Sequence, residues 1–339
     1  MTLALEQVLV TGATGFIGNA LARGLAERGY AVRAIVRKTR LESAAVRALS
    51  ESGVTVVPGD VCNKASVAEA ASGCSHVYHL AAQKTTRGTS FAQYFDVNVK
   101  ATRQLAECAL KAGVTRFVYA STLGVHGFVA GGILDESSPV RPNTDYRRTK
   151  WLGEEVVREL HRERALPAVI ARISTVVGSD AKSWNPLIRA IKRGSIKLIG
   201  NGVNHIDLVS VDDIVNGLWQ CGNVPGIEGQ TYVLGSASRI TLRAFADEIA
   251  HAAGAPSPRN GPPLAPYQAT LRLLAFLYRT TGLHFNVAHN REALVANKIA
   301  SSARARAELG YAPSHPLSDA IRSMVARFAA TENLQPGHR

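Results

Sequence analysis

Short apolar runs alternate with longer amphipathic stretches through the first half of the chain. Helix-spaced apolar positions are clearest over residues 91–112 and 145–164. The runs that predict strands are residues 8–10, 30–37, 54–57, 76–80, 116–120 and 168–172. Strands and helices in strict alternation are typical of an α/β fold built on a doubly wound parallel sheet. Ligands bind such sheets at the carboxyl ends of the strands, so chemistry is expected where these runs end.

The alternation is lost after residue 177. Helical patterns, short strands and loops rich in Gly and Pro follow, most obviously over residues 254–266. We therefore expect one domain over residues 1–177 and a smaller mixed substrate lobe over residues 178–335. Residues 205–222 are expected to pack back on the first domain.

A glycine-rich turn follows the first apolar run. The sequence TGATGFIG spans residues 11–18 and leads directly into a helical pattern. Gly12 allows a sharp turn, Gly15 lets the backbone approach a pyrophosphate, and Gly18 lets the helix pack close to the strand. An anion here meets N–H groups at the positive end of the helix dipole. The turn predicts a Rossmann-type dinucleotide site, with cofactor contacts from Gly12, Thr14, Gly15, Phe16 and Ile17.

The ends of the next strands supply further predicted cofactor contacts. Arg37 and Lys38 stand where NAD-binding proteins usually carry an acid, and a guanidinium there pairs with a 2′-phosphate. This favours NADP(H), with NAD(H) as the alternative. Asp60 and Val61 follow the third strand, where they can reach the adenine. Small side chains follow the fourth strand and let a cofactor lie against the backbone. The predicted contacts there are Leu80, Ala81 and Ala82.

Tyr146 and Lys150 carry the clearest catalytic signal. They lie four residues apart in the sequence YRRTK and so share one face of the predicted helix. A free tyrosine has a pKa of about 10, and a neighbouring ammonium is expected to lower it by stabilising the phenolate. Ser121 and Thr122 follow the fifth strand, where a hydroxyl can polarise a substrate carbonyl or simply cap a turn. His79 is expected to be a core histidine and not a catalyst.

The composition narrows the classes of partner. The chain has 339 residues, 46% hydrophobic and 19% charged, as expected for a globular protein. A small-molecule substrate is expected from the predicted dinucleotide site. Its net charge is +13, but the arginines are dispersed and not grouped with aromatic residues, so nucleic-acid binding is not expected. The four cysteines lack metal-ligand spacing and are expected to be reduced thiols in a cytoplasmic protein. No metal site is predicted.

Membrane signals are weak. No apolar run approaches the roughly 20 residues of a membrane span, and no signal peptide is expected before the first strand. An apolar stretch over residues 270–278 predicts a short helix. We interpret it as core or as a lid over the substrate, with a dimer contact or a membrane-facing surface as the alternatives.

These motifs together resemble the extended short-chain dehydrogenase/reductase family. That family contains NAD(P)-dependent sugar epimerases, dehydratases, dihydroflavonol reductases and 3β-hydroxysteroid dehydrogenases. The resemblance covers nearly the whole chain, and its marks are TGATGFIG, Gly59-Asp60, HLAA (79–82), NVKAT (98–102), FVYASTLGVHG (117–127), YRRTK (146–150), VSVDDIV (209–215) and LGYAP (309–313). Residues 30–37 and 263–313 are most similar to the dihydroflavonol reductase and steroid dehydrogenase branch.

The resemblance implies a catalytic set of one hydroxyl, one tyrosine and one lysine. Counted back from Gly127, the hydroxyl falls on Thr122. Tyr146 is then the acid or base and Lys150 its activator, and both are expected to contact the cofactor. Asn98 is expected beside them as a further cofactor contact. The family commonly dimerises through two long helices, so a homodimer is expected.

Two reactions remain open. The first is hydride transfer between NADPH and a ketone or secondary alcohol. The alternative is a nucleotide-sugar 4-epimerase or 4-ketoreductase, whose substrate diphosphate would be held by Arg172, Arg189, Lys192 and Arg193. A non-catalytic NADP(H) sensor is disfavoured because Tyr146 and Lys150 are both present. The substrate itself cannot be predicted.

Overall fold

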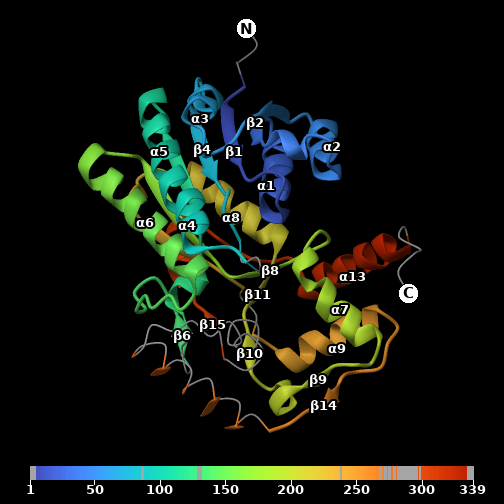
Figure 1. Cartoon of the computed structure of the whole chain (residues 1–339). Helices are drawn as coiled ribbons and strands as arrows, with labels where there is room; N and C mark the ends of the chain where they lie inside the picture. Colours follow the sequence, from blue (N-terminus) through green and yellow to red (C-terminus); the bar gives the residue numbers. More distant parts are fainter. Residues whose placement is uncertain are drawn as a thin grey trace.

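The computed structural model describes residues 5–84, 88–127, 132–236, 239–263, 265–266, 269–270, 273, 276–277, 280, 297 and 299–333. At its centre lies a parallel sheet of seven strands, namely β1 (Gln7–Thr11), β2 (Ala31–Val36), β3 (Thr55–Pro58), β4 (His76–His79), β5 (Arg116–Thr122), β7 (Ala168–Ile173) and β12 (Thr231–Leu234). Their order across the sheet is β12-β7-β5-β4-β1-β2-β3, and β4, β1 and β2 of this sheet are labelled in Figure 1. The predicted α/β fold with a doubly wound parallel sheet is confirmed.

The direction of winding reverses between β1 and β4. The chain first adds β2 and β3 on one side of β1, then crosses over and continues outward through β4, β5 and β7. Val8 of β1 accordingly pairs with Val32 on one side and with His76 on the other. At such a reversal the connecting segments leave in opposite directions and open a crevice at the carboxyl ends of the strands. The glycine-rich turn after β1 lies at this crevice.

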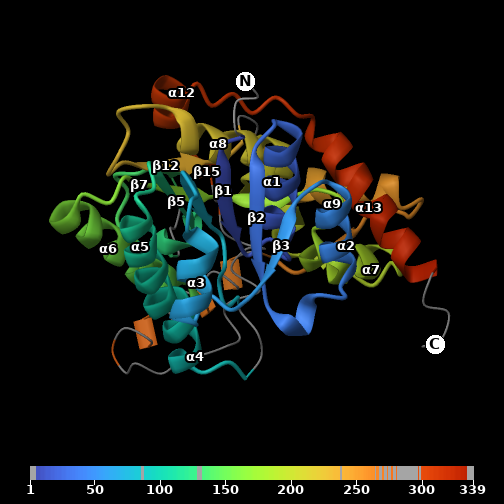
Figure 2. The ribbon, with the colours of Figure 1, turned by 90° about the horizontal axis from the view of Figure 1, so that it is seen from above.

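Side chains of the strands alternate between two cores, one on each face of the sheet. Helices cover both of these faces (Figure 2). Val8 and Val10 belong to one core and Leu9 to the other, and this double burial explains the unbroken apolar runs. The first core is covered by α1 (Phe16–Glu27), α2 (Ala44–Glu51), α8 (Val211–Asn223) and α12 (Ala303–Leu309). The second is covered by α3 (Lys64–Ala71), α5 (Ala101–Ala112) and α6 (Asp145–Arg164).

The helix predicted over residues 91–112 contains a π-helical segment. It begins as α4 (Phe91–Phe95), widens over η2 (Asp96–Lys100), and continues as α5. Asn98 and Val99, in the π-helical segment, are both buried. A π-turn inserts one extra residue in a helix, and such turns often occur at functional sites.

A third core forms a smaller lobe, at the lower right of Figure 1. It is built mainly from α7 (Asn185–Lys192), α9 (Leu242–Ala252) and α13 (Leu317–Asn333). The short strands outside the main sheet are β6 (Ile133–Leu134), β8 (Thr175–Val177), β9 (Lys197–Leu198), β10 (His205–Ile206), β11 (Leu208–Ser210), β13 (Ile240–Thr241), β14 (Arg259–Asn260) and β15 (Ile299–Ala300). The short 3-10 segments are η1 (Lys38–Arg40), η3 (Leu123–His126), η4 (Lys182–Trp184) and η5 (Ile199–Gly202).

Several segments beyond residue 177 lie against the main sheet. β11 pairs with β8, and α8 packs on α1, where Arg28 Nη2 donates to Asn216 Oδ1 at 2.5 Å. β12 joins the sheet beside β7, and α12 packs beside it. The division into domains at residue 177 remains a proposal.

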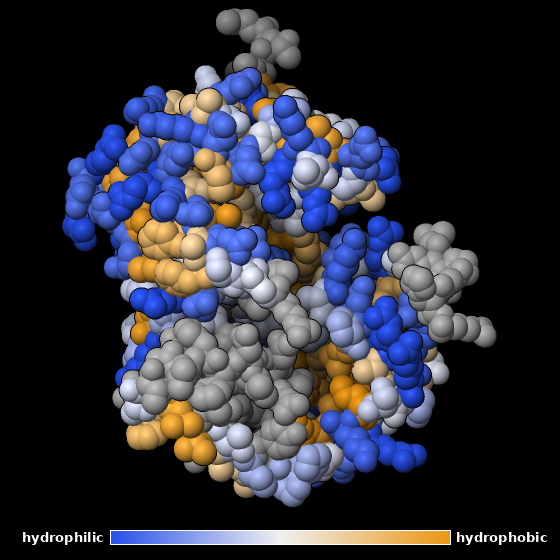
Figure 3. Space-filling model, in the orientation of Figure 1, coloured by the Kyte–Doolittle hydropathy of each residue, from blue (hydrophilic) through white to orange (hydrophobic). Residues whose placement is uncertain are grey.

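Hydrophobic residues are visible inside a hollow between the sheet and the smaller lobe, and polar residues dominate the outer surface above it (Figure 3). Within the described ranges, no helix combines the length and the apolar content needed to cross a bilayer. Most of the predicted helix at 270–278 lies outside the described residues, although Leu273 and Phe276 within it are exposed.

Candidate active site

The predicted catalytic pair lies on the first turns of α6. Thr144 caps this helix, since its Oγ1 accepts a hydrogen bond from the N–H of Arg147 at 3.0 Å. Tyr146 and Lys150 follow one turn apart on the same face, as the spacing predicts. Tyr146 is partly exposed, whereas Lys150 is buried. α6 rests on β5, where the hydroxyl of Tyr119 donates to the carbonyl of Lys150 at 3.3 Å.

The predicted catalytic hydroxyl, that of Thr122, lies at the end of β5 beside α6. Thr122 Oγ1 accepts the N–H of Gly124 at 3.1 Å, which leaves the hydroxyl hydrogen available for donation. A methyl group built on Gly124 would lie 3.2 Å from Thr122 Oγ1 and 3.1 Å from Arg147 Nε. The structure therefore brings Thr122 against the turn of α6 that carries Tyr146.

Ser121 faces the opposite way from Thr122. Its hydroxyl donates to Oε1 of the buried Glu154 at 2.5 Å. Adjacent residues of a strand point to opposite faces of the sheet, so only one of the two hydroxyls can reach the crevice. The geometry agrees with Thr122 as the hydroxyl of the catalytic set and gives Ser121 a place in the core.

Lys150 is held in an unusual environment for a cation. Its Nζ lies 4.0 Å from the centre of the Tyr119 ring, a cation–π contact. Burial lowers the pKa of Lys150 to about 7, although the carboxylate of Glu154 acts in the opposite direction. The lysine can therefore exchange its proton near neutral pH, as a group that assists a proton transfer must.

A lowered pKa was expected for Tyr146, but the structure shows a raised one. Desolvation raises the pKa of Tyr146 to about 12, and the charge that opposes this rise belongs to Arg147. The net pKa of Tyr146 therefore lies above its ordinary value, and a contribution of Lys150 that opposes this rise stays a prediction. The physical reason is that both groups are desolvated, which disfavours the ammonium and the phenolate alike.

A buried ion pair lies behind the catalytic helix. Arg172 Nη2 donates to Glu154 Oε2 at 2.9 Å, and Arg158 donates to the same oxygen at 2.8 Å. Although burial alone would raise the pKa of Glu154, the hydrogen bonds and charge of Arg172, with help from Arg158 and Ser121, lower it. Sequence reasoning missed Glu154, whose one available signal is its position four residues after Lys150.

The basic residues suggested for a substrate diphosphate do not form such a site. Arg172 is 2% exposed and is committed to Glu154, so its guanidinium cannot reach a diphosphate. Arg189 and Lys192 both pair with Glu332, at 3.2 and 3.0 Å. The suggestion that these residues bind a diphosphate together is wrong, because it was based on charge without knowledge of their partners.

His79 is a core histidine, as predicted. It is fully buried, with Nδ1 2.7 Å from Thr11 Oγ1 and Nε2 2.9 Å from Thr102 Oγ1. Burial and the charge of Lys150 lower its pKa to about 3, so the ring is neutral. Thr11 Oγ1 also accepts the N–H of Ala81 at 3.2 Å. The histidine thus joins the glycine-rich turn to the helix that carries Asn98, which accepts from Thr102 through its carbonyl.

Asn98 supports the site from within the π-helical segment. Its side chain accepts the N–H of Gln83 at 2.8 Å and donates to Thr149 Oγ1 at 3.0 Å. It is fully buried and lies next to the backbone of α6, since Thr149 immediately precedes Lys150. In this structure its amide positions neighbouring chain segments, and its predicted contact with a cofactor remains a prediction.

The glycine-rich turn has the shape that a dinucleotide requires. Gly12 has φ +73°, and a Cβ there would lie 2.6 Å from the N of Ala81 and 2.7 Å from the carbonyl carbon of Leu80. The turn therefore lies directly against Leu80 to Ala82, as the predicted contacts require. α1 begins after Gly15 without a side-chain cap, so the N–H groups of its first turn face outward, with Thr14, Phe16 and Ile17 around them.

The residues predicted to bind the adenosine half border the same end of the sheet. Arg37 and Lys38 are exposed just after β2, where a phosphate on the ribose could meet them. Asp60 Oδ1 accepts the N–H of Cys62 at 2.9 Å, so this residue also shapes its own turn. Val61 is partly buried against the second core. The residues present fit a dinucleotide with a phosphorylated ribose.

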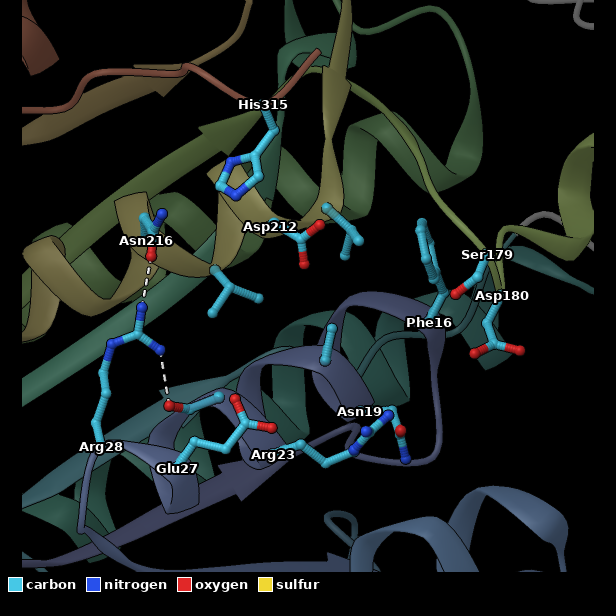
Figure 4. A pocket seen from close by; sticks show the side chains of 14 residues that line it. Phe16, Asn19, Arg23, Glu27, Arg28, Ser179, Asp180, Asp212, Asn216 and His315 are labelled. Atoms are coloured by element: carbon cyan, nitrogen blue, oxygen red, sulfur yellow. Dashed lines mark hydrogen bonds between the residues drawn. The ribbon is translucent and has the colours of Figure 1, made fainter. Parts of the chain in front are cut away.

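A separate pocket of about 320 Å³ lies between α1, the start of α8 and the segment around Asp180 (Figure 4). Its described lining includes Phe16, His315 and Asp212 but none of Thr122, Tyr146 and Lys150. Arg28 closes one end by bonding to Asn216. This pocket is distinct from the site with the catalytic set.

Comparison with known proteins supports the interpretation of the fold and of the motifs. Residues 8–235 match the model of the NAD dependent epimerase/dehydratase family. Sterol demethylase protein B of Methylococcus capsulatus is 31% identical over 318 residues, which cover 90% of this chain and 93% of that protein. A 3-beta-hydroxysteroid dehydrogenase of Mycolicibacterium neoaurum is 30% identical, covering 96% of this chain and 92% of that protein.

Two further similarities extend over almost the full chain. The 2-alkyl-3-oxoalkanoate reductase of Stenotrophomonas maltophilia is 26% identical and covers 96% of this chain and 100% of that protein. The crystal structure of gox2253 superposes with a TM-score of 0.81 at 29% identity, covering 96% of this chain and 98% of that one.

Proposed function

The chain belongs to the NAD dependent epimerase/dehydratase family, and we propose that within it the protein is an NADP(H)-dependent reductase or dehydrogenase of a ketone and its secondary alcohol. The observation that supports this proposal is that Thr122 ends β5 beside α6, the helix that carries Tyr146 and Lys150 one turn apart. Two similar proteins are named for oxidoreductions at a 3-position, one as a 2-alkyl-3-oxoalkanoate reductase and one as a 3-beta-hydroxysteroid dehydrogenase.

The cofactor would be held by the glycine-rich turn and by Arg37. The outward N–H groups at the start of α1 suit the pyrophosphate, and Gly12 leaves the backbone accessible. The exposed Arg37 and Lys38 suit a 2′-phosphate and support NADP(H) over NAD(H). When bound, NADPH supplies the hydride for the carbonyl carbon.

The protein side chains would then act on the oxygen of the substrate. Thr122 donates a hydrogen bond to the carbonyl oxygen as negative charge develops on it. Tyr146 donates its phenolic proton to the same oxygen, and Lys150 stabilises the phenolate that remains. The reverse reaction uses the same groups in the opposite order. A cytoplasmic location and a homodimer through the helices over residues 91–112 and 145–164 remain predictions.

The epimerase alternative predicts a different state of the cofactor. Self-recycling epimerases keep NAD bound, whereas an exchanging reductase releases its product NADP⁺. The test is to purify the protein without added cofactor, denature it, and identify any released nucleotide by mass spectrometry. Titrations with NADPH and NADH follow on the same preparation. Empty protein that prefers NADPH supports the reductase, and stoichiometric retained NAD contradicts it.

Activity of a variant completes the test. Tyr146→Phe should abolish reduction of every ketone while leaving the affinity for NADPH nearly unchanged. A fully active Tyr146→Phe enzyme would be incompatible with the proposed chemistry.

A further inference from the structure

Tyr119 is buried between the main sheet and the catalytic helix. It lies in the middle of β5, and its side chain belongs to the core covered by α3, α5 and α6. Its hydroxyl donates to the carbonyl of Lys150 at 3.3 Å. Burial, together with the charge of Glu154, raises the pKa of Tyr119 well above its ordinary value. The hydroxyl therefore keeps its proton, and the aromatic ring carries no charge.

The face of this ring contacts the amine of Lys150. Nζ lies 4.0 Å from the centre of the Tyr119 ring, within the distance at which the negative face of an aromatic ring attracts a cation. Lys150 is 2% exposed, so water screens this attraction little. The contact therefore opposes desolvation, which disfavours the ammonium form of Lys150.

Other titratable groups surround Lys150 without replacing this contact. Glu154, on the same helix, accepts from Arg172 Nε at 3.1 Å and from Arg172 Nη2 at 2.9 Å, and it acts on Lys150 through its charge. His79 of β4 is neutral, because burial lowers its pKa to about 3. Tyr146 is also neutral, because burial raises its pKa to about 12. The aromatic ring is thus placed to favour the ammonium by direct contact.

We propose that Tyr119 is a positioning residue of the reaction, whose ring holds the amine of Lys150 on the catalytic helix and favours its ammonium form. The inference rests on the proposed function and adds to it a residue that acts through Lys150. The ring widens the pH range in which Lys150 carries the charge that stabilises the phenolate of Tyr146. A ring with a less negative face should therefore let reduction fail at a lower pH.

Phe117 offers a matched position on the same strand. It lies two residues before Tyr119, so both side chains point to the same face of the sheet, and it is equally buried in the same core. The ring centres of Phe117 and Tyr119 lie 6.2 and 5.7 Å from that of His79. The two rings share one environment, but it is the ring of Tyr119 that lies against the amine of Lys150.

The experiment weakens the face of the ring with little change in its shape. Fluorine withdraws negative charge from an aromatic face and is scarcely larger than hydrogen. Tyr119→Phe is the baseline, and position 119 then carries phenylalanine with one, two or three ring fluorines. The same fluorinated residues at position 117 are the control.

Two properties are measured for each protein. The first is the pH at which kcat/KM for the reduction of acetophenone by NADPH falls. The second is the gain in melting temperature that Lys150→Met produces in the same background, at pH 6 and at pH 9. The second property needs no catalytic activity.

The expected result depends on position and on pH. From no fluorine to three at position 119, the fall in kcat/KM should move to lower pH by about 0.5 to 1.5 units, an about 3- to 30-fold weaker binding of the proton by Lys150. The gain from Lys150→Met should grow by about 1–4 °C at pH 6, where the folded protein holds the ammonium. It should stay constant at pH 9, where Lys150 is neutral. Fluorines at position 117 should change neither property.

Other outcomes separate this inference from the proposed function. If acetophenone is reduced but neither property responds to fluorines at position 119, the inference is wrong while the reductase stands. Equal responses at positions 117 and 119 also overturn it, because they would report packing of the core and not the contact with Lys150. If neither acetophenone nor a panel of other ketones is reduced, while the gain from Lys150→Met still grows with fluorination at pH 6, the ring stabilises the ammonium and the reductase is wrong.

Discussion

Ser121 Oγ lies 2.5 Å from Oε1 of Glu154, on the opposite side of β5 from the hydroxyl of its neighbour Thr122. Two adjacent hydroxyls thus have different functions, and substitution should separate them. Thr122→Val should lower kcat for reduction by about 100-fold or more, the effect of losing one donor to a developing oxyanion, with little change in melting temperature. Ser121→Ala should retain most activity and lower the unfolding free energy by about 1–3 kcal/mol, because Glu154 loses a buried partner.

Steady-state kinetics and thermal melts of both variants test this assignment. Ser121 would replace Thr122 in the catalytic set if the two phenotypes were exchanged.

The burial of Lys150 should lower the free energy of unfolding of the protein. Burial lowers its pKa from 10.5 to about 7, so the unfolded chain binds a proton that the folded chain gives up between these values. The penalty is fully present below pH 7 and disappears as the pH rises towards 10.5. Since one unit of pKa corresponds to about 1.4 kcal/mol, Lys150→Met should gain a few kcal/mol at pH 6 while losing activity.

Thermal melts of wild type and Lys150→Met at pH 6 and pH 9 test this prediction. The expected gain is about 5 °C or more at pH 6 and should be smaller at pH 9. Equal gains in melting temperature at both pH values would show that the buried ammonium is not what destabilises the wild-type protein.

The pH profile of reduction should report the same lysine. If the ammonium form of Lys150 assists Tyr146, kcat/KM for reduction is high below pH 7 and falls as the pH rises through about 7. The carboxylate of Glu154 raises the pKa of Lys150, so Glu154→Gln should move this fall to lower pH. Because Arg172 would lose its buried partner, that variant should also lose about 3–5 kcal/mol of stability.

The profile is measured only where circular dichroism shows that the variant is folded. If kcat/KM of Glu154→Gln falls at the same pH as that of the wild type, the carboxylate does not act on Lys150.

Arg37 should set the choice between the two nicotinamide cofactors. Removal of its guanidinium in Arg37→Ala should raise the dissociation constant of NADPH by about tenfold or more and leave that of NADH nearly unchanged. Arg40, exposed in η1 two residues beyond Lys38, provides the control Arg40→Ala. Fluorescence titration with both nucleotides gives the constants. A parallel loss of affinity for both would remove the basis for the NADP(H) preference.

Six of the seven strands of the main sheet and the helix of the catalytic pair could be predicted from local sequence, whereas β12, which joins the sheet from beyond residue 177, was not. The bounds of α6 were predictable because its cap, its apolar spacing and its end all lie within the segment itself. The glycine-rich turn was predictable because Gly12 adopts a positive φ that few other residues tolerate.

The remaining features depend on contacts between distant segments. Thr122 could be chosen over Ser121 only through the family resemblance, because Glu154, the partner that holds Ser121, is 33 residues from it in the chain. The π-turn at Asn98 depends on partners in Gln83 and Thr149 that no periodicity reveals. The net rise in the pKa of Tyr146 could not be predicted, because spacing reports which groups are near and not how far each is desolvated.

Tyr119 of β5 packs tightly against Gly153 of the catalytic helix α6. A Cβ at Gly153 would lie 2.1 Å from the hydroxyl of Tyr119, the same residue whose ring lies under Lys150. The position of Lys150 thus depends on how the large side chain of Tyr119 on β5 fits against Gly153 on α6. In evolutionary terms the two positions form one unit. New substrates can be acquired by changing the surrounding loops, while a mutational path through this pair must alter both residues together.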